Sequence, residues 1–254
     1  MATDIEYDCT AFVGDLHGAF IEFSELVEQI RAKYSNPRII LLGDFFDRGE
    51  RVIDCLNFAR ENKFESVIGN HDYRFLGWLK TRDTSVHYYQ PYYSEISDDN
   101  IDYLRTLPYY IELEDVVCAH AGLKPGLPLT RQEPRDLMYL RYTDNNRRTI
   151  SLKKINKFGK ESTGAKYWTS FMGTGYPKNI IYGHHIMSQE DPTITHYGNG
   201  TMSIGIDTGC VFGGHLLSAV VPRLSTNDGH DWNKIEFLKI KAKKVYHASD
   251  FAVR

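Results

Sequence analysis

The sequence has no apolar run that approaches the length of a membrane-spanning helix, which takes about 20 consecutive apolar residues. Residues 1–9 contain no apolar stretch long enough for a secretory signal peptide. Cysteine is also scarce, since the chain has only four, scattered without the close pairs that mark a zinc site or a disulfide framework. We therefore expect a cytoplasmic protein that makes no membrane contact and contains no disulfide bonds.

Low-complexity linkers are missing as well, and no internal repeat extends beyond a strand-helix-strand unit. These absences argue against separate modules joined by flexible segments. The chain has 254 residues, of which 42% are hydrophobic and 25% charged, as is typical of a soluble globular protein that can bury one large core. We expect one domain over residues 1–254, with its core over roughly residues 10–222.

The clearest positive signal is a group of polar residues that follows a short apolar run. Residues 38–42 (RIILL) are branched and bounded by turn residues, which predicts a buried parallel strand. The strand leads into residues 43–49 (GDFFDRG), at the sheet edge where α/β proteins bind ligands. Asp44 and Asp47 would repel each other there unless a cation holds them. Arg48 is one candidate and a metal ion is a better one, whereas the plain alternative is a turn that ends the strand.

The same arrangement recurs at four other junctions between an apolar run and a loop. Residues 10–13 lead into GDLHG, residues 66–68 into GNHD, residues 116–119 into His120, and residues 180–183 into His184. Carboxylate oxygen, amide oxygen and imidazole nitrogen together suit Mn²⁺, Fe²⁺ or Zn²⁺. Five such junctions favour a shared metal site over separate caps at strand ends.

The segments between these junctions predict the layers of the fold. Residues 19–33 and 50–62 carry apolar side chains on one helical face, so they are expected to be the crossover helices of right-handed βαβ units. The second half is richer in strand-like runs. We expect these strands at residues 109–113, 116–119, 179–182, 193–197, 202–206, 215–221 and 235–240. A helix-rich first half and a strand-rich second half predict a β-sandwich flanked by helices.

The motifs GDLHG, GDFFDRG, GNHD, HAG and GH, in this order, resemble the signature set of the calcineurin-like metallophosphoesterases of the phosphoprotein phosphatase superfamily. Residues 205–214 (GIDTGCVFGG) and 120–126 (HAGLKPG) are most similar to the branch that contains the symmetrical diadenosine tetraphosphatases, and less similar to the small phage protein phosphatases. The resemblance covers roughly residues 10–222. It implies an α/β fold, a four-layer α/β/β/α sandwich of two mixed sheets flanked by helices.

The resemblance also implies a site for two divalent metal ions. The implied ligands of the first ion are Asp15, His17 and Asp44, and those of the second are Asp44 as a bridge, Asn70, His120 and His184. We expect manganese, with iron, zinc, cobalt and nickel as alternatives. Two such ions neutralise a phosphoryl group and lower the pKa of a water, so a hydroxide that bridges them would attack phosphorus in line.

Further roles carried over from the family concern protons and substrate. His71 would protonate the leaving oxygen, and Asp47 would orient its imidazole. Arg48 would clamp the phosphoryl oxygens as a planar fork, and Asn70 would also contact substrate. Arg141 resembles a second arginine that contacts phosphate, although a solvated helix arginine fits its surroundings nearly as well.

The remaining polar residues have less specific patterns. The Gly-His pattern favours His184 over His185 as the ligand, which leaves His185 at the rim of the site. Asp207 follows a predicted strand, and we expect it to orient a loop near the metals instead of binding them. Structural or surface roles are expected for the histidines outside the motifs, which are His196, His230 and His247.

Two segments depart from the compact family core. Residues 87–93 (HYYQPYY) are consistent with an edge for base stacking, but more often such a cluster packs a long loop onto its domain. Residues 141–166, the basic insert, contain eight basic and two acidic side chains. The insert is either a solvated surface or a source of positive charge that attracts substrates with several phosphates.

Together these patterns predict a dinuclear metal-dependent phosphohydrolase. The leading substrates are dinucleoside polyphosphates or related nucleotide ends, which are cleaved at a phosphoanhydride bond. A serine/threonine protein phosphatase acting on a phosphoprotein is the first alternative, followed by a polyphosphatase, and a capped RNA 5′ end is a further candidate partner. A catalytically silent binding module would predict a broken motif, and none is broken. The sequence leaves the oligomeric state open.

Overall fold

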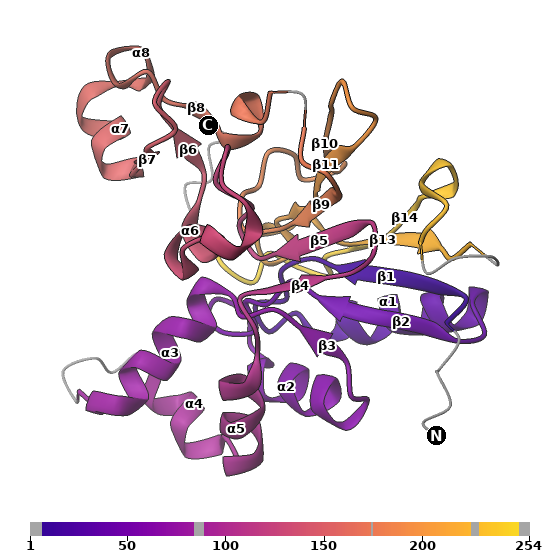
Figure 1. Ribbon diagram of the computed structural model, residues 1–254. Coiled ribbons are helices and arrows are strands. Elements are labelled where there is room, and N and C mark those ends of the chain that lie inside the picture. The colour runs from indigo at the N-terminus through magenta and orange to yellow at the C-terminus, as the bar shows by residue number, and fades with distance from the viewer. Residues whose placement is uncertain (1–6, 84–88, 174, 225–228, 249–254) are drawn as a thin grey trace.

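The computed structural model describes residues 7–83, 89–173, 175–224 and 229–248. Two β-sheets stack face to face at its centre (Figure 1). The first sheet has the order β12-β13-β1-β2-β3, and β14 also pairs with β13. Its strands are β1 (Cys9–Val13), β2 (Pro37–Leu41), β3 (Glu65–Ser66), β12 (Asp207–Thr208), β13 (His215–Pro222) and β14 (Glu236–Lys241).

The first sheet is mixed, and its parallel and antiparallel halves come from different parts of the chain. β1, β2 and β3 run parallel to one another, whereas β13 is antiparallel to β1. The crossovers between the parallel strands are α1 (Phe20–Lys33) and α2 (Val52–Glu61). The carboxyl ends of the three parallel strands therefore meet at one edge of the sheet.

The second sheet has the order β10-β11-β9-β5-β4 and is also mixed. Its central strand β9 runs parallel to both neighbours, and the outer strands pair antiparallel. Its strands are β4 (Tyr110–Glu112), β5 (Val116–Ala119), β9 (Asn179–Tyr182), β10 (Thr193–His196) and β11 (Met202–Gly205).

Alternating side chains on the strands explain how the layers pack. In β1, Ala11 and Val13 belong to the core beneath α1 and α2, while Phe12 belongs to the core between the two sheets. A third core lies on the outer face of the second sheet, where Leu137 of α6 (Pro134–Tyr139) packs with Trp168. The predicted α/β/β/α sandwich with two mixed sheets is therefore confirmed, although its fourth layer is thin.

The predicted strand and helix positions agree closely with the structure. The seven strands expected in the second half all form, and each end lies within one residue of its prediction. The four cysteines are buried and unpaired. Among the described residues, no helix combines the length and apolar character needed to cross a membrane.

A helical group, α3 (Asn70–Thr81), α4 (Gln90–Glu95) and α5 (Asp98–Thr106), lies below the first sheet in Figure 1. Tyr89 is buried, with its ring centroid 5.6 Å from that of Phe75 and 5.7 Å from that of Trp78. The described part of the tyrosine-rich segment therefore packs onto α3, and the first two residues of that segment lie outside the described ranges.

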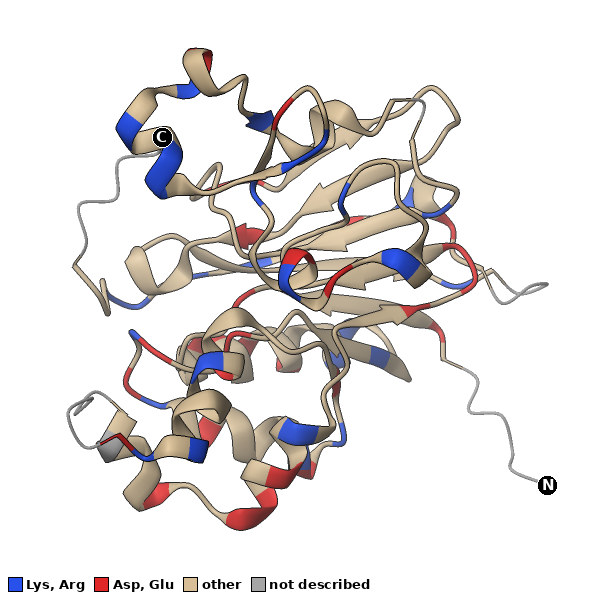
Figure 2. Cartoon of the chain, turned by 60° about the vertical axis from the view of Figure 1, so that its left-hand side comes forward, with Lys and Arg blue, Asp and Glu red and all other residues tan. Residues whose placement is uncertain are grey.

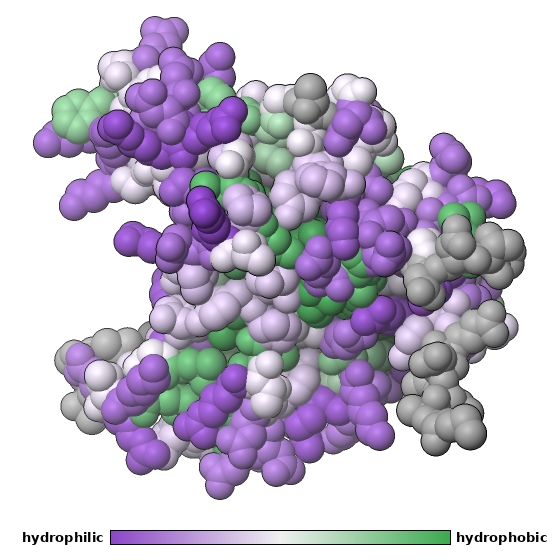
Figure 3. Space-filling model, viewed as in Figure 1, coloured by the Kyte–Doolittle hydropathy of each residue, from purple (hydrophilic) through white to green (hydrophobic). Residues whose placement is uncertain are grey.

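The basic insert, together with Tyr167, forms a small unit that the strand and helix patterns did not predict. Three two-residue strands form a separate sheet, and buried Ile155 packs with Tyr142, Ile150 and Ala165. The elements are β6 (Tyr142–Thr143), β7 (Thr149–Ile150), α7 (Leu152–Phe158), α8 (Lys160–Thr163) and β8 (Lys166–Tyr167). Lysine and arginine gather on this unit in Figure 2, and in Figure 3 it overhangs a hollow on the left of the molecule.

Candidate metal centre

Asp44 lies at the centre of a cluster of histidines that come from four separate segments of the chain. Its Oδ2 atom is 3.4 Å from Nε2 of His17, 3.4 Å from Nε2 of His120 and 3.9 Å from Nε2 of His71. Two groups of metal-type donors share this carboxylate, one with His17 and His71 and the other with His120 and His184. Within each group the donor atoms lie within 4.8 Å of one another. A shared carboxylate between two donor groups is the arrangement that a pair of cations requires.

Hydrogen bonds at Nδ1 fix the ring orientation of two of these histidines, His17 and His120. Nδ1 of His17 lies 2.6 Å from the carbonyl oxygen of Phe46, and Nδ1 of His120 lies 2.7 Å from that of Leu42. Because a carbonyl oxygen only accepts, each Nδ1 carries a proton and each Nε2 is turned toward Asp44. Metal-binding histidines are oriented in this way in proteins.

The buried charges of the cluster also favour the binding of a cation. Burial and the neighbouring carboxylates of Asp207 and Asp44 raise the pKa of Asp15 well above its usual value. Burial lowers the pKa of the His120 imidazole, but the Asp44 and Asp15 carboxylates outweigh that effect and raise this pKa to about 10. The buried carboxylates therefore favour positive charge at the centre of the cluster.

The loops that form the cluster are held in an unusual backbone conformation. Five of their non-glycine residues have positive φ, namely His17 (43°), Asp44 (53°), Asp47 (73°), Arg48 (76°) and His184 (68°). Such conformations cost on the order of 1–3 kcal/mol each and persist where the surroundings enforce them. Their concentration here indicates that these loops are held in strained conformations, which place their side chains at the site.

Two glycines allow these loops to approach one another. A Cβ atom at Gly69 would lie 2.1 Å from Oδ1 of Asp44, and one at Gly183 would lie 2.1 Å from Oδ1 of Asp15. Any side chain at either position would displace a carboxylate of the cluster. Close approach therefore explains why glycine precedes the polar residues in two of the motifs.

Asp15 and Asn70 lie at the cluster but make different contacts. The Asp15 carboxylate accepts from the backbone amide of His184, at 3.1 and 3.2 Å, and is not a member of either donor group found in the described chain. Oδ1 of Asn70 lies 3.0 Å from Nε2 of His120. Asp207 accepts from the amide of Gly209 at 3.0 Å and is close enough to raise the pKa of Asp15.

His71 lies between an acidic and a basic neighbour. Its Nδ1 atom makes a short contact with Oδ2 of Asp47, and its Nε2 atom lies 3.2 Å from Nη2 of Arg48. Arg74, which had no role in the sequence analysis, donates to Oδ2 of Asp47 at 3.2 Å. The ring is therefore oriented by Asp47 while its other nitrogen faces the arginine expected to bind phosphate.

Asp72 is a structural support of the site that the sequence analysis missed. Its two carboxylate oxygens accept from the backbone amides of Asp44 at 2.8 Å, Phe45 at 2.8 Å, Phe46 at 3.2 Å and Gly69 at 3.1 Å. Burial and the charge of Asp44 raise the pKa of Asp72 to about 7. An acidic residue at the third position of a helix that follows a turn, here α3, was the available signal.

Arg141 lies beside the cluster, where one of the two sequence interpretations placed it. Its Nη2 atom donates to the carbonyl oxygen of His184 at 3.3 Å, and it lines a cavity of about 170 Å³ together with Arg48. His185 lines the same cavity, with its ring stacked on Tyr167 at a centroid distance of 5.2 Å. Two guanidinium groups beside a cluster of metal-type donors can hold a phosphoryl group.

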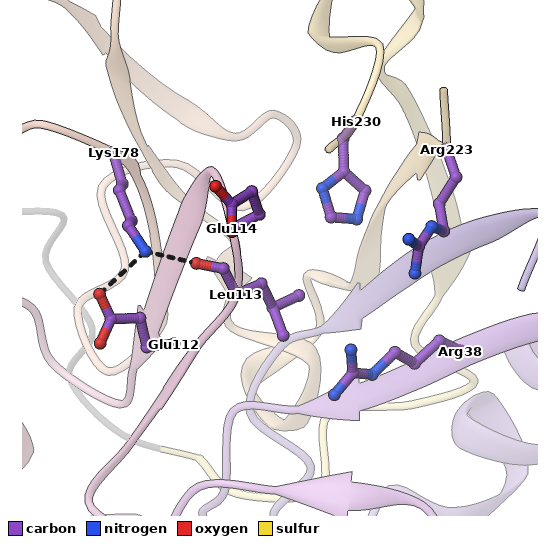
Figure 4. A pocket seen from close by; sticks show the side chains of 7 residues that line it. All are labelled: Arg38, Glu112, Leu113, Glu114, Lys178, Arg223 and His230. Atoms are coloured by element: carbon purple, nitrogen blue, oxygen red, sulfur yellow. Dashed lines mark hydrogen bonds and ion pairs between the residues drawn. The ribbon is translucent and has the colours of Figure 1, made fainter. Parts of the chain in front are cut away.

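A larger cavity, of about 460 Å³, opens at the other end of the sandwich, near the start of β2 (Figure 4). Three of its basic lining residues are paired: Lys178 lies 2.9 Å from Glu112, His230 binds Asp115 at 2.7 Å, and Arg38 binds Glu65 at 2.6 Å. Nε2 of His230 also lies 2.8 Å from the hydroxyl of Thr10. This end of the molecule is a paired polar network, and His230 has the structural role expected of it.

Comparison with known proteins identifies the family. Residues 10–219 match the family model of the calcineurin-like phosphoesterases, which covers most of the chain. The chain belongs to this family. Membership of the calcineurin-like phosphoesterases implies a dinuclear divalent metal site. The residues around Asp44 fit such a site. Carboxylates and imidazoles held by hydrogen bonds are suitable ligands, and the buried carboxylates favour a cation between them.

Curated relatives of this calcineurin-like phosphoesterase include symmetrical bis(5′-nucleosyl)-tetraphosphatases. The protein from Actinobacillus succinogenes is 32% identical over 127 residues, which is 46% of this chain and 45% of that relative. The one from Aromatoleum aromaticum is 36% identical over 123 residues, which is 45% of this chain and 44% of the relative. The chain thus spans less than half the length of the curated relatives it matches.

Solved structures share the fold of this calcineurin-like phosphoesterase along nearly its whole length. A protein proposed to be a diadenosine tetraphosphatase has a TM-score of 0.69 and 22% identity, covering 94% of this chain and 95% of its own. A serine/threonine phosphatase from Saccharomyces cerevisiae has a TM-score of 0.56 and 16% identity, covering 95% of this chain and 82% of its own. At these identities the similarity establishes the fold alone.

Proposed function

We propose that the protein is a dinuclear metal-dependent phosphohydrolase that cleaves phosphoanhydride bonds in dinucleoside polyphosphates or related nucleotide ends. The observation that carries this proposal is the pair of donor groups that share Asp44 beside the two arginines Arg48 and Arg141. The names of the curated relatives, symmetrical bis(5′-nucleosyl)-tetraphosphatases, support the substrate class.

The proposed metal ligands follow the motifs, and four of them, His17, Asp44, His120 and His184, also belong to the two donor groups. Asp15, His17 and Asp44 would hold one ion, and Asp44, Asn70, His120 and His184 would hold the other. The anchored rings of His17 and His120 support this set, since each presents Nε2 to Asp44. Manganese suits the mixture of oxygen and nitrogen donors and is the metal that we propose.

When bound, the two ions would neutralise the phosphoryl oxygens and lower the pKa of the attacking water. Arg48 and Arg141 would hold the phosphoryl oxygens and orient the phosphorus for attack. As the bond from phosphorus to the leaving oxygen breaks, His71 would give that oxygen a proton from Nε2. Asp47, in contact with Nδ1, would hold the imidazole in the required orientation.

The test is a comparison of substrates on manganese-loaded protein. Diadenosine tetraphosphate, a phosphoserine peptide, capped RNA and polyphosphate would be compared by kcat/KM, with products separated by chromatography. The expected result is preference for diadenosine tetraphosphate and release of adenosine diphosphate. Equal or faster turnover of the phosphoserine peptide would overturn the proposed substrate class in favour of a protein phosphatase.

A further inference from the structure

The cavity beside Arg48 and Arg141 is also lined by His184, His185 and Asp207, and the rest of its wall carries no charged side chain. Apolar and amide side chains make up this wall, which consists of Tyr142, Leu152, Asn156, Ile186 and Phe212. A volume of about 170 Å³ is below the roughly 300–1,000 Å³ of pockets that enclose a whole ligand. The cavity therefore suits one end of an extended substrate whose phosphates lie at the arginines.

The position of helix α7 explains why this wall is not basic. Leu152 and Asn156 are four residues apart, so they share one face of the helix, and both line the cavity. Ile155 is buried in the small core of the basic insert and anchors the helix. Lys153 and Lys154 do not line the cavity, so the helix turns an apolar and amide face toward the arginines.

Neighbouring side chains hold the other parts of the wall in place. The guanidinium carbon of Arg48 lies 5.0 Å from the centroid of the Phe212 ring, which links the phosphate side of the cavity to its apolar side. Two cavity residues, Arg141 and His185, have buried nitrogens, Nε and Nε2, that make no hydrogen bond within the described structure. Buried polar groups are normally paired, so these atoms favour a polar ligand close by.

We propose that this cavity binds the adenosine end of the substrate, with the base against Leu152 and Phe212 and its edge at Asn156. The inference rests on the proposed function, because it assigns the nucleoside next to the phosphates at Arg48 and Arg141. The Asn156 amide has an oxygen that can accept from N6 of adenine and an NH2 group that can donate to N7. An inorganic polyphosphate would gain nothing from an apolar wall, whereas a purine gains from both Leu152 and Phe212.

Direct binding tests this inference independently of turnover. Adenosine diphosphate, guanosine diphosphate and methyl diphosphate, which has the same two phosphates without a nucleoside, would be titrated into manganese-loaded protein by calorimetry. Adenosine diphosphate is expected to bind about 10-fold more tightly than methyl diphosphate, within the range for one stacked base. Leu152→Ala should remove most of this preference, and Asn156→Ala should remove the preference for adenosine over guanosine diphosphate.

The matched control is Lys153→Ala together with Lys154→Ala, on the same helix but outside the cavity wall, which should leave all three affinities unchanged at roughly physiological salt. Leu152 is 39% exposed, so its truncation is expected to leave the melting temperature unchanged. Equal affinity for adenosine diphosphate and methyl diphosphate, or equal losses for both in the Leu152 variant, would overturn the inference even if diadenosine tetraphosphate is cleaved. A retained adenosine preference without cleavage of diadenosine tetraphosphate would overturn the proposed function and leave the inference standing.

Discussion

The loops around Asp44 and the basic insert border the same cavity, but the chain builds them in opposite ways. The Asp44 loops are buried, have positive φ at five non-glycine residues and are fixed by hydrogen bonds to backbone groups. The insert has a small core around Ile155 and places most of its polar side chains in solvent. A site that moves protons and binds metals needs fixed atoms, whereas a wall that selects a substrate needs only a suitable face. We therefore expect changes in the two regions to have effects of very different size.

The largest effect is expected from Asp44→Asn. The substitution removes the charge that the two donor groups share, so one of the two bound metal ions and hydrolysis should be lost. Metal content measured by mass spectrometry should fall by one equivalent, and hydrolysis of p-nitrophenyl phosphate should fall below detection. A variant that keeps two metals and a normal rate would remove the basis for a dinuclear site.

The next effect concerns proton transfer by His71. His71→Asn should leave metal content intact and slow hydrolysis of a substrate with a poor leaving group by roughly 10²–10⁴-fold. The loss should be smaller for p-nitrophenyl phosphate, because p-nitrophenolate leaves without a proton. If both substrates lose the same factor, His71 positions a group instead of donating a proton.

A third change tests how the Asp44 loop is supported. Asp72→Ala would leave the amides of Asp44, Phe45, Phe46 and Gly69 without their acceptor, and each unpaired buried group costs about 1–3 kcal/mol. We expect a loss of at least about 3 kcal/mol in the free energy of unfolding, measured by urea denaturation, together with weaker metal binding. The control is Asp98→Ala in α5, which lies away from the site and should change stability little. Equal stability of the two variants would contradict this role for Asp72.

The smallest effect is expected from the charge of the insert. Replacing Arg147, Arg148, Lys153 and Lys154 by alanine removes four cations that do not line the cavity. Their remaining influence is long-range attraction, which is screened over about 8–10 Å at physiological salt. KM for diadenosine tetraphosphate should rise by less than about threefold at low salt and not at all at 0.15 M salt. A large increase that survives added salt would show direct contact between these residues and the phosphates.

The difference between the Asp44 loops and the basic insert also explains which features could be predicted from the sequence. The strands that deliver Asp15, Asp44 and His120 are apolar on both faces, and each ends at a glycine or polar motif, so their positions were predictable to within about one residue. The helix position of Asp72 was visible in the sequence, but its support of the Asp44 loop was not, because those three contacts run to amides far away in the chain. The fold class was equally accessible, since the order of apolar runs predicts a β-sandwich flanked by helices and the family resemblance implies its two mixed sheets.

The insert was harder to predict for physical reasons. Strands of two residues, such as β6 and β7, are too short to show the alternation of a strand. The seven-residue helix α7 contains three lysines, and only its anchoring through Ile155 decides which face meets the cavity. The basic composition was evident in the sequence, but the apolar wall formed by Leu152 and Phe212 required three-dimensional contacts.

The most direct test of a dinuclear centre at Asp44 is anomalous diffraction from crystals of the manganese-loaded protein. Two anomalous peaks about 3.5–4 Å apart are expected, one on each side of the Asp44 carboxylate, with His17 bound to one ion and His120 to the other. A single peak, or manganese bound away from Asp44, would contradict the account.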